Sequence, residues 1–269
     1  MIDGTIGGGG HAEEILKKIG PKGKLLGIDW DKKNIENLKS KFKDYPNAIL
    51  IRGNYADLPE ILEKEKLPEA DGLLIDLGFS SEQLESGRGF SFQKDEVLDM
   101  RYEGEGQTAA EIVNSLPEKD LADIFWKFGE ERYSRQIAKK IVEERRRERI
   151  LTTGRLAEIA KLAVPKNYEK GRINPATRIF QALRISVNDE LGNLGRLLGN
   201  LEKVLKNKGR AAAISFHSLE DRMVKNFFRE AKKSGKAEIL TKKPITASDE
   251  EIKENPRSRS AKLRAAIIK

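Results

Sequence analysis

The chain of 269 residues contains no cysteine and only two histidines, and these shortages exclude several kinds of site. Without a thiol there is no disulfide framework, no cysteine zinc site and no thiolate nucleophile. His11 and His217 supply too few nitrogen ligands for zinc unless carboxylates complete the set, so we expect no metal site. The lack of cysteine fits a reducing compartment, and we expect a cytoplasmic protein.

Long apolar runs are also lacking. No stretch approaches the roughly 18 apolar residues that a membrane-spanning helix needs, so we expect no membrane partner. Charged residues make up 35% of the chain and aromatic residues only 6%, as in a charge-rich globular protein. The net charge of +8 favours a polyanionic partner, with nucleic acid first. A basic protein without such a partner is the alternative.

Glycine, in contrast, is concentrated near the start of the chain, where residues 7–10 are all glycine. We expect these glycines to join a short strand to a helix over residues 12–19. Glycines let the backbone turn sharply and let a ligand approach the main chain, and the helix presents free N–H groups to that ligand. A second expected strand ends in Asp29. A glycine loop after one strand and an acid after the next are typical of the nucleoside-binding half of a doubly wound α/β sheet.

Two cofactors compete for this loop. The spacing of Gly7, Gly9 and Ala12 also fits the dinucleotide fingerprint. Asp3, however, would repel a pyrophosphate by up to about 4 kcal/mol per pair of charges at an effective dielectric near 20. The same acid would attract the ammonium and sulfonium of S-adenosylmethionine, which we therefore favour, with Asp29 accepting the ribose hydroxyls. The alternative is that Asp3 only braces the loop.

Further polar residues follow the next strands. The third expected strand leads to Tyr55, a candidate for stacking on the adenine or, equally, a half-buried loop aromatic. The fourth ends at Asp76. Since the carboxyl ends of parallel strands meet at the ligand edge, we expect Asp3, Asp29 and Asp76 to lie together. Gln83 serves the helix that begins there, the cofactor or both.

A long segment with little periodicity follows, in which Arg88 alternates with Phe90 and Phe92. Long aperiodic segments in compact domains are usually functional. Arginine interleaved with phenylalanine suits contact with phosphates and stacking on bases. A loop packed by its own aromatic side chains explains the pattern equally well.

The pattern becomes purely helical after residue 108, with a capping box expected from Ser115 to Glu118. Arg132, Arg135 and Lys139 recur on one face, which could hold RNA, although such charged faces are more often simply solvated. The expected division is a sheet segment over 1–102, an inserted all-α domain over 103–171 and a second sheet segment over 172–269.

The fifth expected strand ends at His217, which we take as a candidate site residue because it lies at the ligand end of the strand. Ser218 and Asp221 are expected to cap the helix that follows. Arg257 and Arg259 lie in a basic loop between the last two strands, a sequence fit for binding phosphates.

Motifs along essentially the whole chain carry a resemblance to one family. They are DGTIGGGGH at 3–11, DLGFSSEQL at 76–84, RGFSF at 88–92, LDMR at 98–101, GEER at 129–132, PATRIFQALRI at 175–185, ISFHSLEDR at 214–222 and NPRSRS at 255–260. Together they resemble the RsmH/MraW family of bacterial small-subunit ribosomal RNA cytosine-N4 methyltransferases. So many long motifs in the same order are highly specific.

The resemblance implies a Rossmann-like class I methyltransferase sheet with an inserted all-α domain. It implies transfer of a methyl group from S-adenosylmethionine to the exocyclic amine of one cytidine in the decoding region of 16S ribosomal RNA. The implied cofactor contacts are Gly9, Gly10, His11, Asp29, Tyr55, Asp76 and Gln83. The candidate substrate contacts are Arg88, Phe90, Phe92, His217, Arg257 and Arg259. Asp76 is also the candidate catalytic residue, as an acceptor for the protons of the amine.

The small ribosomal subunit is the implied partner, and a homodimer is an oligomeric state that the sequence leaves open. Two other functions compete with this interpretation. One is an RNA-binding ribosome assembly factor on a degenerate methyltransferase scaffold, against which the intact glycine loop and acids argue. The other is a dinucleotide-dependent oxidoreductase, which Asp3 disfavours.

Overall fold

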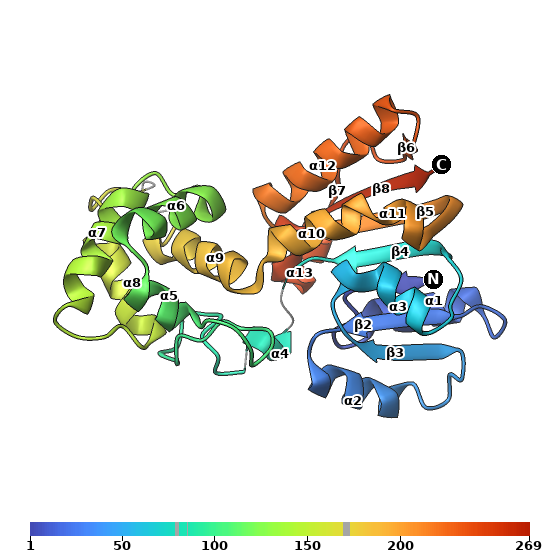
Figure 1. Cartoon of the computed structure of the whole chain (residues 1–269), viewed down its shortest axis with the longest axis horizontal. Coiled ribbons are helices and arrows are strands. Elements are labelled where there is room, and N and C mark those ends of the chain that lie inside the picture. The colour runs from blue at the N-terminus through green and yellow to red at the C-terminus, as the bar shows by residue number, and fades with distance from the viewer. Residues whose placement is uncertain (79–80, 85, 169–172) are drawn as a thin grey trace. The chain divides into compact units, whose positions relative to one another are not determined.

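The computed structural model describes residues 1–78, 81–84, 86–168 and 173–269 (Figure 1). The chain divides into two compact units. The sheet unit comprises residues 1–78 and 191–269, and the helical unit comprises residues 79–190. Among the helices described, none is long and apolar enough to cross a membrane.

An eight-stranded sheet forms the centre of the sheet unit as far as it is described, in the order β3-β2-β1-β4-β5-β8-β6, with β7 paired to β8. The first five strands of this order are parallel, and β8 runs antiparallel to β5 and β6. The strands are β1 (Ile2–Asp3), β2 (Leu25–Asp29), β3 (Ala48–Arg52), β4 (Ala70–Asp76), β5 (Leu205–Ser215), β6 (Ala237–Ile239), β7 (Ile245–Thr246) and β8 (Lys262–Ile268). The predicted Rossmann-like α/β sheet is confirmed.

Strand β1 has only two residues, yet it pairs on both sides. Ile2 lies opposite Leu26 of β2 and Leu73 of β4, and it is buried in the core. The short strand therefore lies at the centre of the sheet, where it is hydrogen-bonded to a longer strand on each side. As a consequence, Asp3 reaches the same edge of the sheet as the acids that end β2 and β4.

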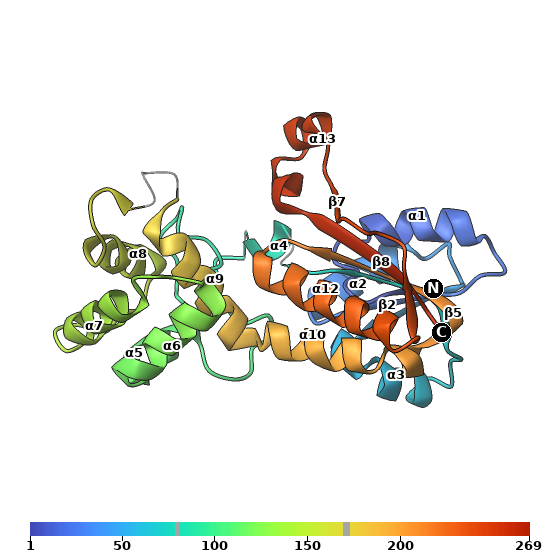
Figure 2. The same cartoon turned by 90° about the horizontal axis from the view of Figure 1, so that it is seen from above.

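Helices cover both faces of the sheet (Figure 2). On one face, α3, α10, α11 and α12 pack their leucine, valine and phenylalanine side chains against β1, β4 and β5. On the other, α1 and α2 enclose a smaller core with β2. The bounds are α1 (Gly10–Ile19), α2 (Lys32–Lys41), α3 (Leu58–Lys64), α10 (Glu190–Gly199), α11 (Leu201–Val204), α12 (Ser218–Lys233) and α13 (Asp249–Glu254).

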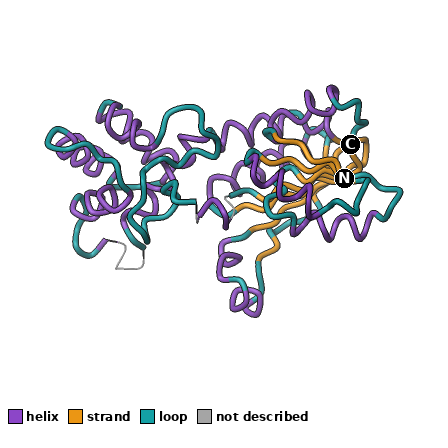
Figure 3. Tube along the Cα trace, turned by 90° about the horizontal axis from the view of Figure 1, so that it is seen from below, coloured by secondary structure: helices purple, strands orange, loops and turns teal. Residues whose placement is uncertain are grey.

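The helical unit is built from helices and loops (Figure 3). Its helices are α4 (Ser81–Leu84), α5 (Ala109–Ser115), α6 (Glu118–Gly129), α7 (Ser134–Arg145), α8 (Thr153–Leu162) and α9 (Pro175–Asn188). The unit extends beyond the 103–171 segment expected from the helical pattern. Phe90 and Leu98 before that segment, and Ile179 and Leu183 after it, are buried in the helical core.

The expected capping box at Ser115 is wrong. Helix α6 follows Pro117 and has no side-chain cap, because the Ser115 hydroxyl donates instead to the Glu111 carbonyl within α5 (2.7 Å). The capping box occurs one helix earlier, where Thr108 and Glu111 satisfy each other's backbone N–H groups at the start of α5.

Candidate functional site

The glycine loop joins β1 to α1 in a conformation that only glycine adopts easily. Gly7 and Gly9 have φ angles of +48° and +78°. A Cβ on Gly9 would lie 2.6 Å from Cδ2 of Leu38 in α2. A Cβ on Gly10, in contrast, would meet no described atom within 4 Å. The loop therefore packs tightly on its α2 side and is open above Gly10, at the first turn of α1.

Asp29 ties this loop to the end of β2. Its carboxylate accepts hydrogen bonds from the backbone N–H of Gly7 (2.9 Å) and of Asp31 (2.7 Å), and from the Asn34 side chain (3.2 Å). Burial raises the pKa of Asp29, and these hydrogen bonds oppose that rise. A carboxylate has about four acceptor positions, so Asp29 retains capacity for a hydroxyl donor.

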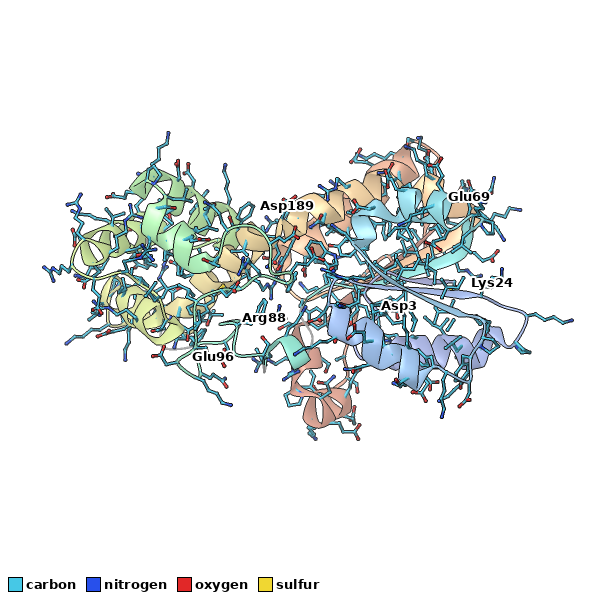
Figure 4. All side chains as sticks on the ribbon, turned by 60° about the horizontal axis from the view of Figure 1, so that its bottom comes forward. Asp3, Lys24, Glu69, Arg88, Glu96 and Asp189 are labelled. Carbon is cyan, nitrogen blue, oxygen red and sulfur yellow. The ribbon has the colours of Figure 1, made fainter. Side chains whose placement is uncertain are left out.

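Asp3 is the most deeply buried acid of the site, with 1% of its surface exposed (Figure 4). Its Oδ1 accepts a hydrogen bond from the Thr5 N–H (3.2 Å), whereas its Oδ2 has no hydrogen-bond partner among the described residues. Burial raises the pKa of Asp3 to about 6, with smaller opposing effects from the Thr5 hydrogen bond and from His11. A buried oxygen without a partner is costly, so this position favours a ligand that supplies a donor or a positive charge.

Asp76 ends β4, the strand next to the one that ends at Asp3. Its backbone N–H donates to Thr5 Oγ1 (2.6 Å), and its Oδ2 lies 3.5 Å from Nε2 of His11. The hydrogen bond to Asp76 raises the pKa of His11. Oδ1 of Asp76 is buried and, within the described part of the chain, lacks a hydrogen-bond partner. Sequence reasoning gave Thr5 no role, although its place between an acid and the glycine run was a usable signal.

Tyr55 is half-buried at the start of a 3-10 turn (Tyr55–Asp57) after β3. Gly4 makes room for it, since a Cβ there would lie 3.2 Å from the Tyr55 Cβ. The turn is fixed by Asn54, which accepts from the Ala56 N–H (2.8 Å) and donates to Asn193 Oδ1 of α10 (2.7 Å). Sequence reasoning missed Asn193, because one asparagine in a helix rich in glycine gives no signal.

His217 caps α12 at the end of β5. Its Nδ1 accepts from the Glu220 N–H (3.4 Å), and the Glu220 carboxylate accepts from the Phe216 N–H (2.9 Å). The expected caps at Ser218 and Asp221 are therefore wrong: the box is formed by His217 and Glu220. Asp221 instead pairs with Arg264 of β8 (2.7 Å), which competes for its carboxylate. His217 Nε2 lies 3.2 Å from Glu220 Oε1.

Arg257 and Arg259 belong to a 3-10 helix (Pro256–Ser260) directly before β8. Both are exposed, whereas Ser258 between them is buried. Because β8 runs antiparallel to β5, with Lys262 opposite Ser215, the two arginines approach the sheet at the end of β5 where His217 lies.

The remaining predicted residues belong to the helical unit. Phe90 is buried and stacks on Tyr102, with ring centroids 5.6 Å apart and planes 12° apart. Phe92 packs edge-on against Phe180. Arg88 donates to the carbonyls of Arg101 and Tyr102 (both 3.1 Å). These contacts support the alternative of a loop packed by its own aromatics, and the role of the three residues in RNA binding stays a prediction. Gln83 is also buried in this unit.

The geometry of the sheet unit fits a phosphate-free, positively charged nucleoside ligand. Asp3, Asp29 and Asp76 end three neighbouring strands, and buried oxygens of Asp3 and Asp76 lack partners among the described residues. Carboxylates so placed repel a pyrophosphate and attract an ammonium or a sulfonium. The first turn of α1 is open beside them, since a Cβ on Gly10 would meet no described atom within 4 Å.

Comparisons with known proteins agree with this geometry. The model of the MraW methylase family matches residues 1–269. The protein named Ribosomal RNA small subunit methyltransferase H from Coprothermobacter proteolyticus is 49% identical over 265 residues, covering 98% of this chain and 87% of the relative. Proteins of the same name from Sulfurihydrogenibium sp. and Syntrophobacter fumaroxidans are 48% and 45% identical, covering 98% of this chain and 90% and 88% of the relatives. The resemblance carried by the motifs is thus confirmed, and the chain belongs to the MraW methylase family.

Proposed function

We propose that this chain methylates the N4 amine of one cytidine in the decoding region of 16S ribosomal RNA. Ribosomal RNA methylation with S-adenosylmethionine is the activity of the family; the target atom is the proposed part. The observation that carries the proposal is the pair of buried, unpartnered oxygens on Asp3 and Asp76, which lie at one edge of the described sheet beside the glycine loop. The Asp3 oxygen suits a cationic cofactor, and the Asp76 oxygen suits an amine donor.

The sheet unit offers a coherent set of groups to S-adenosylmethionine, which supplies an electrophilic methyl group when bound. Asp3 would bind its positively charged groups and Asp29 its ribose hydroxyls. Tyr55 would stack on its base. Gly9, Gly10 and His11 would shape the first turn of α1 around it. Gln83 of the helical unit is a proposed contact on the strength of the family motif.

Asp76 is the proposed proton acceptor. The cytosine amine is a poor nucleophile because its lone pair is delocalised into the ring. As N4 gains the methyl group, it must shed a proton, and the Oδ1 of Asp76 is free of internal partners in the described structure to receive it. His11, 3.5 Å from Oδ2, holds the other oxygen of the carboxylate in place. Alignment of the two reactants supplies much of the rate.

Substrate contacts are proposed at His217, Arg257 and Arg259 on the sheet unit, and at Arg88, Phe90 and Phe92 on the helical unit. The target base must leave its stack to be reached, and a site near the end of β5 with basic side chains suits its flanking phosphates. The partner is then the small ribosomal subunit, and the reaction takes place in the cytoplasm where subunits are assembled.

Single-turnover methylation tests this assignment. Enzyme loaded with labelled S-adenosylmethionine is mixed with small subunits that lack the modification. We expect Asp76→Asn to slow the transfer at least 100-fold, in the range that general-base catalysis contributes. An unchanged rate would remove Asp76 from the mechanism. Cofactor binding without transfer in the unaltered chain would instead support the assembly-factor function.

A further inference from the structure

The positive charge of this protein is distributed unequally between its two units. In the sequence, residues 79–190 contain 20 basic and 20 acidic side chains, so the helical unit has no net charge. The sheet unit contains 31 basic and 23 acidic side chains, which accounts for the whole net charge of +8. Its excess comes from residues 191–269, with 19 basic against 9 acidic side chains. An electrostatic attraction to RNA therefore centres on this segment.

Helix α12 arranges part of this charge in a stripe. The stripe consists of Arg222, Lys225, Arg229 and Lys232, which recur every three or four residues and are all exposed. The opposite side of the helix buries Val224 and Phe228 against the sheet. At 1.5 Å per residue, the stripe is about 15 Å long. One strand of a duplex has a phosphate about every 3.4 Å along the axis, so this length matches about four phosphates.

The stripe begins at the catalytic edge of the sheet. Helix α12 starts at Ser218, directly after His217, and β5 runs parallel to β4 with Ile214 opposite Asp76. The first turn of α12 is therefore at the strand ends where Asp76 lies, and the stripe leads away from them. A strand that follows the stripe is guided toward the methyl-transfer site.

Acidic side chains hardly interrupt the stripe. Glu230 lies 3.7 Å from Nε of Arg229, but it pairs more closely with Lys233, at 2.9 Å. Both contacts are exposed to solvent, and exposed ion pairs are weak enough for a phosphate to replace them.

Several basic side chains of the helical unit take part in internal ion pairs and hydrogen bonds. Lys140 and Arg155 neutralise the buried Glu144, at 2.9 and 2.6 Å. Arg145 donates to the carbonyls of Val113 and Leu116 at the end of α5. The expected face of Arg132, Arg135 and Lys139 is exposed, as is Arg146.

We propose that the stripe on α12 is the surface on which the ribosomal RNA backbone docks to the sheet unit. The inference rests on the proposed function, since it assumes that RNA is the substrate. It goes further by assigning the main electrostatic contact to the catalytic unit rather than to the helical unit, and to a helix outside the cofactor site.

A matched pair of triple variants tests the proposal. One carries K225Q, R229Q and K232Q on α12, and the other carries R135Q, K139Q and R146Q on the helical unit. Both remove three exposed positive charges, and glutamine retains good helix propensity. For each we would measure the dissociation constant for unmodified small subunits at several salt concentrations, together with the affinity for S-adenosylhomocysteine.

The α12 variant is expected to bind subunits at least tenfold more weakly, and the slope of log Kd against log salt is expected to fall by about 2, since each phosphate contributes about 0.7 to 0.9. The control variant should change the dissociation constant less than threefold. Both should bind S-adenosylhomocysteine like the unaltered chain, which shows that they are folded.

Equal losses in the two variants, or no loss in the α12 variant, would overturn the proposal. So would weaker binding with an unchanged salt slope, which would indicate a contact with subunit protein. Because the readout is binding, it is independent of methyl transfer. A chain that binds through the stripe but transfers no methyl group would refute the proposed function and leave the docking surface intact.

Discussion

The backbone N–H of Asp76 donates a 2.6 Å hydrogen bond to the hydroxyl oxygen of Thr5. This bond joins the carboxyl ends of β1 and β4, which carry Asp3 and Asp76. The N–H of Thr5 in turn donates to Asp3 (3.2 Å). Thr5 thereby holds the proposed cofactor acid and the proposed catalytic acid in fixed relation, and it is a positioning residue for both.

Replacement of this hydroxyl tests the link. Thr5→Val keeps the shape of the side chain but removes the acceptor, leaving a partly buried N–H unsatisfied. We expect it to lower the free energy of unfolding by about 1–3 kcal/mol and to reduce single-turnover methylation more than S-adenosylhomocysteine affinity. Thr5→Ser retains the oxygen and should restore most of both. Equal behaviour of the two variants would show that the bond is not important.

Two neighbouring glycines should respond differently to alanine. Gly9→Ala must adopt a φ of +78° and bring its Cβ to 2.6 Å from Leu38 Cδ2, so we expect destabilisation by about 2–4 kcal/mol. Gly10→Ala meets open space at the start of a helix and should leave the stability of the free protein unchanged or raise it by up to about 1 kcal/mol. Thermal unfolding would measure both.

The same Gly10→Ala variant locates the cofactor. If S-adenosylmethionine lies against the first turn of α1, the added methyl group occupies its space, and calorimetry should show an affinity at least tenfold lower. Full affinity in this stable variant would mean that the cofactor lies elsewhere.

Asp29 and Asp31 form a second matched pair. Asp29→Asn keeps one acceptor oxygen where the carboxylate serves the N–H groups of both Gly7 and Asp31, so we expect a loss of about 1–2 kcal/mol of stability and a clear loss of cofactor affinity. Asp31→Asn keeps the cap on the Lys33 N–H (2.8 Å), because asparagine caps helices as well as aspartate does. Its stability and affinity should stay within experimental error; similar losses in both would indicate a general charge effect.

The buried Asp3 predicts a pH dependence. Burial raises its pKa to about 6, whereas the unfolded chain has the ordinary value of 3.8. The folded state therefore holds this proton more tightly, and its stability falls as the pH rises from about 4 to about 6, by at most about 3 kcal/mol. Asp3→Asn should abolish this fall and be the more stable protein at pH 8. Denaturant unfolding at pH 4 and pH 8 measures the difference.

Cofactor binding should show the opposite trend. The ammonium of the ligand favours the ionised carboxylate, so the affinity of the unaltered chain for S-adenosylhomocysteine should rise toward pH 6 and then level. The affinity of Asp3→Asn should be lower and should hardly change with pH over this range. Identical pH profiles for the two proteins would exclude Asp3 from contact with the ammonium.

The sequence was most informative where the signal is local. A strand that ends in an acid can be recognised from a few residues, and Asp3, Asp29 and Asp76 do end neighbouring strands. Caps were predicted less well, because several side chains compete for one helix end. His217 and Glu220 cap α12 where Ser218 and Asp221 are expected, and Asp221 pairs with Arg264 instead.

Long-range packing was the other limit. The periodicity of Ile179 and Leu183 indicates an apolar helix face but not which core receives it, and the structure buries both in the helical unit. The hydrogen bond from Asn54 to Asn193 joins residues 139 positions apart, and local sequence gives no sign of it. The basic face expected on the helical unit was prominent as a pattern, yet that unit has no net charge.

The most direct measurement is methyl transfer from labelled S-adenosylmethionine to small ribosomal subunits that lack the modification, followed by digestion of the RNA to nucleosides. We predict that the label appears in N4-methylcytidine and that Asp76→Asn loses it while still binding cofactor. Label on another nucleoside, or cofactor binding with no label in any RNA, would contradict it.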